Sequence, residues 1–545
     1  MAHKNILLIE PSYKNKYPPL GLMKIAQYHG PRGKTDNVTF IKGEDAKVFS
    51  QHWDRIYVTT LFSFEWKRIS RSIDFALEVA NGQADKVFVG GIAASLMRER
   101  FVAEARWRGV RFIKGLLDKT PAESLQLDDF SEELYSSDLD SRPIEDLIPD
   151  YSILDQVTYR YPVNDAYFTY ASRGCIRKCS FCGVPKLEGA QRDTESITDI
   201  VRGIERLYGP KKDLVLMDNN VVASPRFKDI IAEIRDLGFT PGAKLRRGRV
   251  PVQRRVDFNQ GVDARILCKD PMFLRELSTI CIKPLRIAFD HLGLKKPYTQ
   301  AVRYACDVGL TNLSNYMLYN FHDTPQDLFE RMRLNVSLNE ELGVRIFSFP
   351  MRYQPTDLPD RSHVGKNWNR YWLRSMQLIL QATHGIVSGA PDYFRHAFGD
   401  TFEQFENILM RPQHFIFNRN WYERQSGRPT FDAYDAQIRK LSEADRTELL
   451  ALLSAHGPSQ YASAFKDCSN RKVASLGTFY APLPKEYERA IWDEQRKMKV
   501  NPGPAETIPQ DELVEDAGLY EDDVEAGQQA MRRKVEQPIS VEAVT

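Results

Sequence analysis

Three cysteines, Cys175, Cys179 and Cys182, lie within eight residues of the stretch YASRGCIRKCSFCGVPK, in a C-x3-C-x2-C arrangement. The whole chain of 545 residues contains only seven cysteines. Such a triplet should arise by chance in roughly one chain of this kind in a thousand. In a reducing compartment, grouped thiols bind metal or carry out redox chemistry more often than they form disulfides. The triplet is therefore the first candidate for a metal site.

The spacing of the cysteines bears on which metal they could hold. Structural zinc takes four ligands, typically from paired C-x2-C units. No second pair exists, and no histidine occurs between residues 173 and 250. The other cysteines are isolated from one another: Cys268, Cys281, Cys306 and Cys468. A 4Fe–4S cluster held by three thiolates leaves one iron open to a substrate or cofactor, and this is the site that we predict.

The elements that must position this triplet begin with an N-terminal series. The runs NILLIEP, RIYVTTLFS and DKVFVGGIAAS predict strands, and PPLGLMKIAQYHG predicts a helix between them. This alternation predicts an α/β, doubly wound, Rossmann-like domain over residues 1–120. Gly90 and Gly91 directly follow one of the strands, where a tight turn is the favoured interpretation and close approach to a ligand the alternative.

A second alternating series begins at AYFTYASRGC and contains six predicted strands with helices between them. It predicts a partial (β/α)6 barrel of the TIM type over residues 164–355, with the cysteine loop directly after its first strand. An acidic connector is expected at residues 121–163. A mostly α-helical domain is expected at residues 356–500.

The net charge of +2 conceals an acidic C-terminal segment. Residues 501–545 contain eleven Asp and Glu against three Lys and Arg, with few large apolar residues. This composition predicts a largely disordered tail. The N-terminus lacks an apolar signal core, and no apolar run approaches the roughly 18 residues that span a bilayer. We therefore expect a cytoplasmic protein without a membrane segment.

The motif CIRKCSFC, with Phe181 at its aromatic position, resembles the signature of the radical S-adenosylmethionine (radical SAM) enzymes. The resemblance implies that the three cysteines hold a 4Fe–4S cluster and that S-adenosylmethionine chelates the open iron. One electron then cleaves S-adenosylmethionine to a 5′-deoxyadenosyl radical, which abstracts hydrogen from a substrate. It also implies a one-electron donor of the flavodoxin or ferredoxin type. The substrate stays open between nucleic acid, nucleotide, peptide and small metabolite.

The segments YPPLGLMKIAQYHG and KVFVGGIAAS are similar to the N-terminal cobalamin-binding-type domain of one radical SAM subgroup. Cobalamin domains with a histidine ligand to cobalt carry a D-x-H-x-x-G motif after the first strand. Here that region reads EPSYKNKYPPLG, and His29 lies at the end of the following helix. We predict that any cobalamin binds without a histidine ligand, and we favour a scaffold or substrate platform over a cobalamin site.

Further ligands are implied by the family's use of polar side chains at strand ends. By position, the candidates for the cofactor are Asp218, Asn219, Arg265 and Asp290, together with Phe181. Arg265 could bind the methionyl carboxylate through two hydrogen bonds, or could form an ordinary salt bridge. Weaker candidates for acid–base catalysis are His291 and His322. Cys281 and Cys306 could quench a radical, although packing is commoner for such cysteines.

The basic segment KLRRGRVPVQRR precedes the third barrel strand. On the barrel rim, Arg246, Arg247 and Arg249 could bind the phosphates of a nucleic acid or nucleotide, while a solvated loop is the plainer interpretation. A rival to the enzyme hypothesis follows: a degenerate radical SAM scaffold that binds nucleic acid or another polyanion.

Overall fold

A computed structural model describes residues 3–120, 142–194, 196–383 and 385–499. The chain divides into two compact units. The first comprises Met1–Leu318, Leu338–Ile346 and Met351–His363, and the second comprises Tyr319–Ser337, Phe347–Pro350 and Val364–Thr545. Part of the predicted connector and all of the predicted acidic tail lie outside the described residues.

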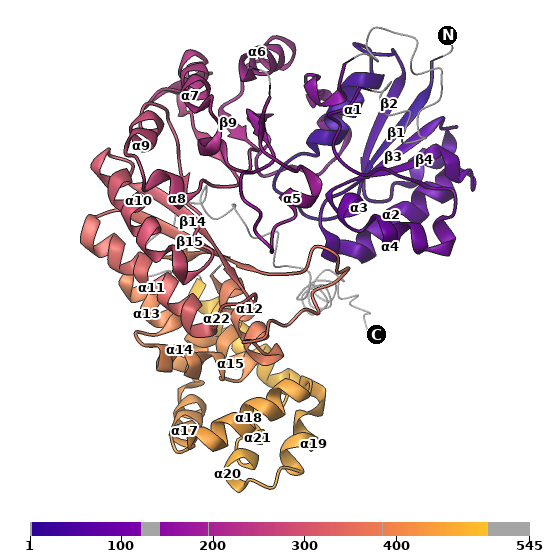
Figure 1. The fold of residues 1–545 in the computed structure, drawn as a ribbon. Helices are drawn as coiled ribbons and strands as arrows, with labels where there is room; N and C mark the ends of the chain where they lie inside the picture. Colours follow the sequence, from indigo (N-terminus) through magenta and orange to yellow (C-terminus); the bar gives the residue numbers. More distant parts are fainter. Residues whose placement is uncertain (1–2, 121–141, 195, 384, 500–545) are drawn as a thin grey trace, which may run out of the picture. The chain divides into compact units, whose positions relative to one another are not determined.

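The N-terminal part of the first unit is a five-stranded parallel sheet with the strand order β2-β1-β3-β4-β5. Its strands are β1 (Asn5–Glu10), β2 (Asn37–Lys42), β3 (Arg55–Thr60), β4 (Val87–Gly91) and β5 (Arg111–Phe112). Helix α1 (Leu20–His29) lies on one side of the sheet, and α2 (Trp66–Val79), α3 (Ile92–Leu96) and α4 (Arg98–Ala103) lie on the other (Figure 1). The predicted doubly wound domain is confirmed.

The sheet is held by apolar side chains that alternate along its strands. Leu7 and Ile9 of β1 belong to one large buried cluster that includes Ile69 and Ile73 of α2. Successive side chains of a strand point to opposite faces, so Ile6 and Leu8 are left for the face that α1 covers. Burial on both faces explains why NILLIE is a continuous apolar run.

The six predicted barrel strands are all present in the structure. A parallel three-stranded sheet has the order β12-β9-β6, and a second sheet has the order β13-β14-β15-β16. The six strands are β6 (Ala166–Thr169), β9 (Asp213–Leu216), β12 (Val256–Phe258), β13 (Leu285–Arg286), β14 (Asn312–Tyr319) and β15 (Arg345–Arg352), and the second sheet adds β16 (Val387–Ser388). Two isolated parallel bridges, Val256 to Ile282 and Val262 to Ile287, connect the two sheets.

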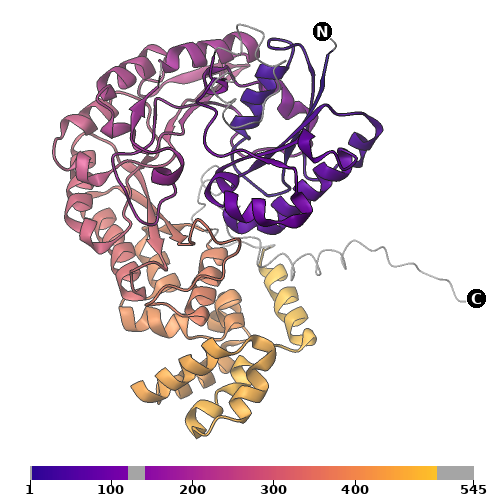
Figure 2. The same ribbon diagram turned by 45° about the vertical axis from the view of Figure 1, so that its right-hand side comes forward.

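Helices cover the outer side of these strands. Figure 2 shows them as an arc around the strands of the first unit. They are α6 (Ile197–Tyr208), α7 (Phe227–Asp236), α9 (Met272–Leu277) and α10 (Lys295–Asp307). Within the described residues no pairing joins β15 back to β6, so the strands form an open barrel, as the sequence predicts.

The basic segment forms a hairpin of β10 (Lys244–Arg247) and β11 (Val250–Gln253). Arg247 donates to both carboxylate oxygens of Asp165, which immediately precedes β6. The hairpin is therefore attached at the amino-terminal ends of the barrel strands. The cysteine loop leaves the carboxyl end of β6, so the hairpin and the loop lie at opposite ends of the barrel strands.

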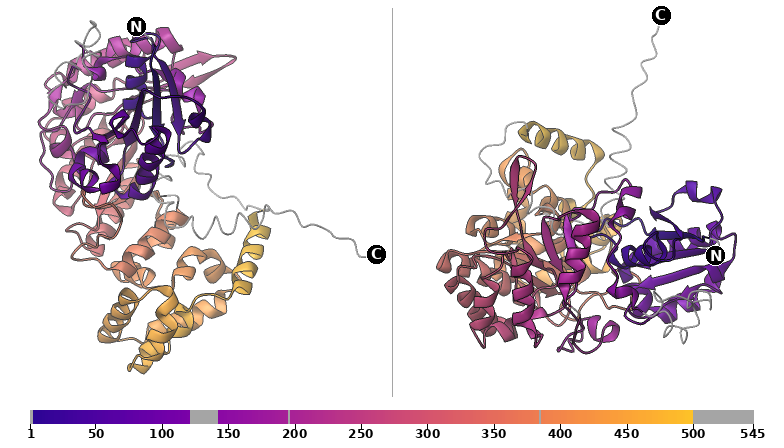
Figure 3. Two further views of the ribbon diagram at one scale, coloured as in Figure 1. Left: turned by 90° about the vertical axis from the view of Figure 1, so that its right-hand side faces the viewer. Right: turned by 90° about the horizontal axis from the view of Figure 1, so that it is seen from above.

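The described C-terminal part of the second unit consists mainly of short helices packed on one another (Figure 3). The helices α15 (Gln413–Phe417) and α16 (Arg419–Arg424) bury Phe415, Trp421 and Tyr422. The others are α12 (Arg370–Ala382), α13 (Pro391–Phe398), α14 (Phe402–Leu409), α17 (Arg428–Ile438), α18 (Glu443–Ala455), α19 (Tyr461–Lys466), α20 (Arg471–Ala474), α21 (Gly477–Tyr480) and α22 (Lys485–Lys499). No helix in the described part of the chain is both long and apolar enough to cross a membrane.

Candidate iron–sulfur site

The three cysteines lie in one loop that is closed at its base by two short antiparallel strands. These strands are β7 (Ser172–Arg173) and β8 (Arg192–Asp193). Gly174 opens the loop with a φ of +73°, and a Cβ there would lie 2.2 Å from the carbonyl oxygen of Ala190. Glycine is therefore required where the chain turns into the cysteine motif.

The thiols of the loop are half-exposed, and two of them accept backbone hydrogen bonds. The amide of Arg177 donates to Sγ of Cys175 at 3.3 Å, and the amide of Val184 donates to Sγ of Cys182 at 3.4 Å. Hydrogen bonds to sulfur favour the thiolate and tune the potential of an iron–sulfur cluster. Burial raises the pKa of Cys179, with Asp290 and Cys175 raising it further and Arg265 opposing them.

These features fit a ligand set for a cluster. Three accessible thiols share one loop, two of them accept hydrogen bonds from backbone amides, and the pKa of Cys182 is raised by burial and further by Cys179 and Cys175. Among the described residues, no three Cys, His, Asp or Glu side chains converge tightly enough to hold a single metal ion. The fit to a cluster thus rests on the number and chemistry of the donors.

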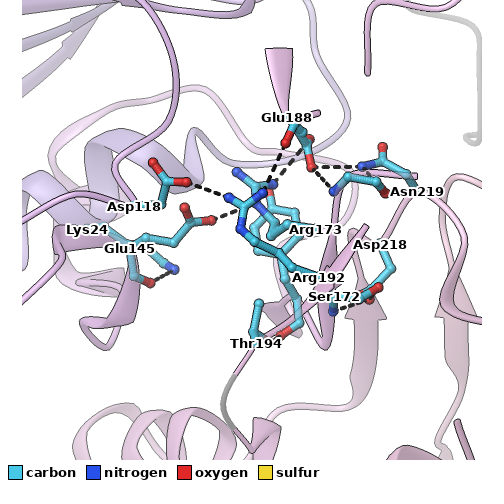
Figure 4. Close-up of polar contacts among 12 residues, drawn as sticks. Lys24, Asp118, Glu145, Ser172, Arg173, Glu188, Arg192, Thr194, Asp218 and Asn219 are labelled. Carbon is cyan, nitrogen blue, oxygen red and sulfur yellow. Dashed lines mark hydrogen bonds and ion pairs between the residues drawn. The ribbon is translucent and has the colours of Figure 1, made fainter. Parts of the chain in front are cut away.

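The end of strand β9 fixes both ends of the cysteine loop (Figure 4). Asp218 is 1% exposed, and its carboxylate accepts hydrogen bonds from the amide of Ala171 at 3.0 Å and from the Ser172 hydroxyl at 2.7 Å. Asn219 donates to Glu188 at 2.8 Å. Both were predicted to bind the cofactor; in the structure both side chains are occupied in holding the loop.

Glu188 holds the start of the cysteine loop, and its partner Arg173 continues toward the N-terminal domain. One of its carboxylate oxygens accepts from the amide of Gly174 at 2.8 Å, and the other lies 3.4 Å from Arg173. Arg173 also pairs with Glu145 at 2.9 Å, and Lys24 of α1 donates to the carbonyl oxygen of Glu145 (Figure 4). A buried chain of charges therefore links α1 to the root of the cysteine loop.

A second anchor holds the middle of the loop. Arg177, between the first two cysteines, donates to Asp263 at 2.7 Å, and the same carboxylate accepts from Nε of Arg265 at 2.7 Å. Asp263 follows β12 and is 8% exposed. Its pKa is lowered because the hydrogen bonds from Arg265 and Arg177 outweigh the opposing effect of burial, which is the largest single influence.

Two of the predicted cofactor residues affect the pKa of one of the cysteines. Arg265 and Asp290 both influence the ionisation of Cys179, from the carboxyl ends of different barrel strands. Nε of Arg265 is held by Asp263, and the guanidinium also interacts with the Cys179 thiol. Phe181 is half-buried within the loop itself.

The remaining candidates differ in their surroundings. His291 is exposed beside the start of α10, and His322 is exposed in the second unit with its ring centroid 3.8 Å from that of Phe321. Cys281 is 8% exposed, and burial raises its pKa to about 11. Sγ of Cys306 lies 3.6 Å from the carbonyl oxygen of Leu342. Both thiols thus have the surroundings of packing cysteines.

In the N-terminal domain, the carboxyl ends of β1 and β2 are occupied by the protein's own side chains. Glu10 is 1% exposed, pairs with Lys42 at 2.9 Å and accepts from Asn15 at 2.7 Å and from Tyr161. The Lys42 ammonium lies 4.6 Å from the ring centroid of Tyr159. The side chains that follow β1 in the segment EPSYKNKYPPLG are thus held by contacts within the protein.

His29, at the end of the helix that follows β1, is enclosed by protein side chains. His29 is fully buried, with Nδ1 2.8 Å from Asp36 and Nε2 3.0 Å from the hydroxyl of Tyr57. Gly91 has a φ of +102°, and a Cβ there would lie 2.3 Å from the carbonyl oxygen of Thr60. Gly91 therefore permits close packing of β4 on β3, and both glycines lie within β4 and pair with β3.

Sequence reasoning missed the residues that hold the loop in place. Glu188, Arg173, Arg177 and Asp263 carry the anchoring contacts, and none was a candidate. For two of these residues, the sequence contained a feature that could have identified them. Glu188 is a lone acid in a basic loop, and Asp263 lies two residues from Arg265 in GVDARIL.

Comparisons with known proteins returned solved structures alone. No family model and no curated protein matches the sequence. The radical SAM methyltransferase TsrM from Kitasatospora setae, solved with cobalamin and a 4Fe–4S cluster, matches 65% of this chain and 77% of its own at 15% identity and a TM-score of 0.44. TsrM with tryptophan and a SAM analogue matches 91% and 99% at 13% identity and a TM-score of 0.46.

A third solved structure has a similar arrangement. The cobalamin-dependent S-adenosylmethionine radical enzyme OxsB matches 99% of this chain and 82% of its own at 12% identity and a TM-score of 0.45. At such identities the likeness concerns the fold alone. The chemistry of this chain is therefore argued from its own residues.

Proposed function

We propose that this protein is a radical SAM enzyme. The observation that supports it most is the placement of the C-x3-C-x2-C loop: it follows the first strand of an open parallel barrel and is anchored by residues at the carboxyl ends of two other strands. In α/β barrels this edge carries the chemistry. When bound, a 4Fe–4S cluster supplies the electron that cleaves S-adenosylmethionine to a 5′-deoxyadenosyl radical.

The residues of the site divide into ligands and positioning residues. Cys175, Cys179 and Cys182 would hold the cluster, and Phe181 would line it. Arg265, fixed through Nε by Asp263, would bind the methionyl carboxylate with its terminal nitrogens.

Asp290 would face the cofactor from the carboxyl end of a neighbouring strand. Asp218 and Asn219 would act indirectly, by holding the loop that carries the cysteines. His291 and His322 stay weaker candidates for proton transfer to or from the substrate.

Anaerobic reconstitution with iron and sulfide tests the proposal. We expect about four irons and four sulfides per chain, and 5′-deoxyadenosine on addition of S-adenosylmethionine and dithionite. Cys179→Ala should abolish both, whereas Cys306→Ala, a matched change at a cysteine outside the loop, should abolish neither. A reconstituted cluster that yields no cleavage of S-adenosylmethionine would refute the enzyme proposal.

A second variant separates cofactor binding from cluster assembly. Arg265→Met removes the proposed carboxylate ligand but leaves the cysteines and Asp263 in place. We expect an unchanged iron content and an affinity for S-adenosylmethionine that is weaker by about tenfold, the effect of losing roughly 1.4 kcal/mol. An unchanged affinity would remove Arg265 from the binding site.

Two partners of the reaction are part of the same proposal. The electron would come from a flavodoxin- or ferredoxin-type donor, and substitution of such a donor for dithionite should support cleavage. Any cobalamin would bind without a histidine ligand, because His29 is buried between Asp36 and Tyr57. Purification with hydroxocobalamin followed by a visible spectrum tests this: a histidine-ligated signal would contradict it.

A further inference from the structure

The hairpin β10–β11 stands apart from the candidate site and carries a strongly basic surface. Six of its twelve residues between 244 and 255 are Lys or Arg. All four residues of β11 are exposed, including Val250 at 72% and Val252 at 38%. A two-stranded hairpin of this length is marginally stable alone, so its shape must be maintained by contacts at its base.

Two arginines supply those contacts. Arg247 donates to both oxygens of Asp165, at 2.9 and 3.1 Å. Arg254 places its guanidinium carbon 3.7 Å from the ring centroid of Phe239 and donates to the carbonyl oxygen of Lys211 at 3.2 Å. These contacts fix the hairpin to the amino-terminal edge of the barrel, and they remove both arginines from the set available to a partner.

Three other cations of the hairpin lie together. In an antiparallel pair, directly opposed residues share a face. Lys244 is opposite Gln253 and Arg246 is opposite Pro251, so Lys244 and Arg246 lie on one face. Arg249 lies in the turn, beside Gly248 with a φ of +72°. The side chains of Lys244, Arg246 and Arg249 have no ion-pair or hydrogen-bond partner among the described residues.

The dimensions of this face suit a nucleic-acid duplex. Four residues at a rise of about 3.4 Å make strands of about 14 Å, spaced about 4.8 Å apart. The major groove of B-form DNA is about 12 Å wide and admits a two-stranded ribbon, whereas the major groove of A-form RNA is too narrow. Cations that have no internal partner match the phosphates that flank such a groove.

We propose that the β10–β11 hairpin is an arm that binds duplex DNA through Lys244, Arg246 and Arg249. The arm lies at the opposite ends of the barrel strands from the cysteine loop, so it would hold DNA without contacting the cluster. The proposal goes beyond the radical SAM function and does not depend on it.

Fluorescence anisotropy of the full chain with a labelled random-sequence DNA duplex of about 20 base pairs tests the arm. Each phosphate contact contributes about 0.9 to the slope of log Kobs against log salt. The triple variant Lys244→Gln, Arg246→Gln, Arg249→Gln should therefore lose about 2 to 3 units of slope and bind at least about tenfold more weakly at low salt.

A matched control removes the same charge from another surface. The control is a triple variant that neutralises three exposed cations of the N-terminal domain with no ion-pair partner among the described residues: Lys47→Gln, Lys67→Gln, Arg71→Gln. This variant should keep the slope of the unaltered protein. Equal losses in the two triple variants would show a general effect of net charge and would overturn the proposal.

Two further outcomes would also overturn it. The first is equal affinity for duplex RNA, and the second is full competition by polyglutamate, which would indicate a site for acidic polymers in general. The cleavage of S-adenosylmethionine, measured without DNA, should be the same in all variants, so failure of the arm and failure of the enzyme proposal are distinguishable.

Discussion

The anchor between Arg177 and Asp263 gives a prediction about the cysteine loop that needs no assumption about the substrate. Asp263→Asn keeps the shape of the side chain and one acceptor oxygen. That oxygen is expected to stay with the amide and Nε of Arg265, which both bond Oδ1 at 2.9 and 2.7 Å. The amide NH2 then faces Nε of Arg177, where Oδ2 accepts at 2.7 Å, and the loop loses this ionic contact.

The free energy lost with this contact can be estimated from the burial of Arg177 and Asp263. A hydrogen bond to a charged group contributes about 1.5–3 kcal/mol. The Arg177 side chain is 34% exposed and that of Asp263 is 7% exposed. Solvent screening at Arg177 favours the lower end of that range, about 1.5 kcal/mol. Loss of that amount should raise the population of the opened loop about tenfold.

Two assays measure the opening. In the cluster-free protein, alkylation of Cys175, Cys179 and Cys182, followed by mass spectrometry, should be about tenfold faster in Asp263→Asn. In the reconstituted protein, loss of iron to a chelator should accelerate in the same direction. The matched control is Asp74→Asn, which also alters a carboxylate bonded to two side chains, Arg106 at 2.8 Å and Trp107 at 2.7 Å.

The contact between Asp263 and Arg177 should weaken as the pH falls. Because the pKa of Asp263 is lowered in the folded protein, its contribution is present above the ordinary Asp range and is lost as pH falls through the folded pKa. Acidification of the unaltered protein should therefore reproduce the faster alkylation of the variant, after correction for thiol ionisation. Equal alkylation rates for Asp263→Asn and the unaltered protein would refute the anchoring argument.

Three further predictions concern buried charges. Burial lowers the pKa of Lys24 from 10.5 to about 8. The free energy of unfolding should therefore rise by about 3 kcal/mol between pH 8 and 10.5. In denaturant titrations, Lys24→Met should reduce this rise of unfolding free energy with pH. Burial also lowers the pKa of His29, so stability should fall as pH drops below the ordinary His range of about 6.5, and His29→Gln should reduce that fall. Asp257→Asn breaks the paired hydrogen bonds to Arg286, which is 1% exposed, and should cost about 3 kcal/mol of unfolding free energy; a cost below about 1 kcal/mol would contradict burial of an uncompensated charge.

Several features of the fold were predictable because they depend on short-range patterns. The apolar runs NILLIE and DLVL are strands in the structure, and the helix predicted at PPLGLMKIAQYHG is α1. Alternation of strands and helices along the chain predicted both parallel sheets, since parallel strands need a crossover between them. The end of the barrel at which the basic hairpin lies was not predictable, because proximity in sequence to a barrel strand does not say at which end of the strand a segment lies.

The sequence by itself determined the cysteine triplet, its place after the first barrel strand, and the absence of a histidine motif after β1, because each depends on residues that are neighbours in the chain. Only the tertiary structure decided which polar side chains support the triplet. Arg177 meets Asp263 across 86 residues, and Tyr17 reaches Asn259 across 242. Spacing and periodicity encode local elements, whereas the partner of a buried charge depends on which strand ends packing brings together. Asp218 illustrates the difference: its position after β9 predicted a ligand of the cofactor, and only the tertiary structure shows that its carboxylate accepts a hydrogen bond from Ser172 at the root of the loop.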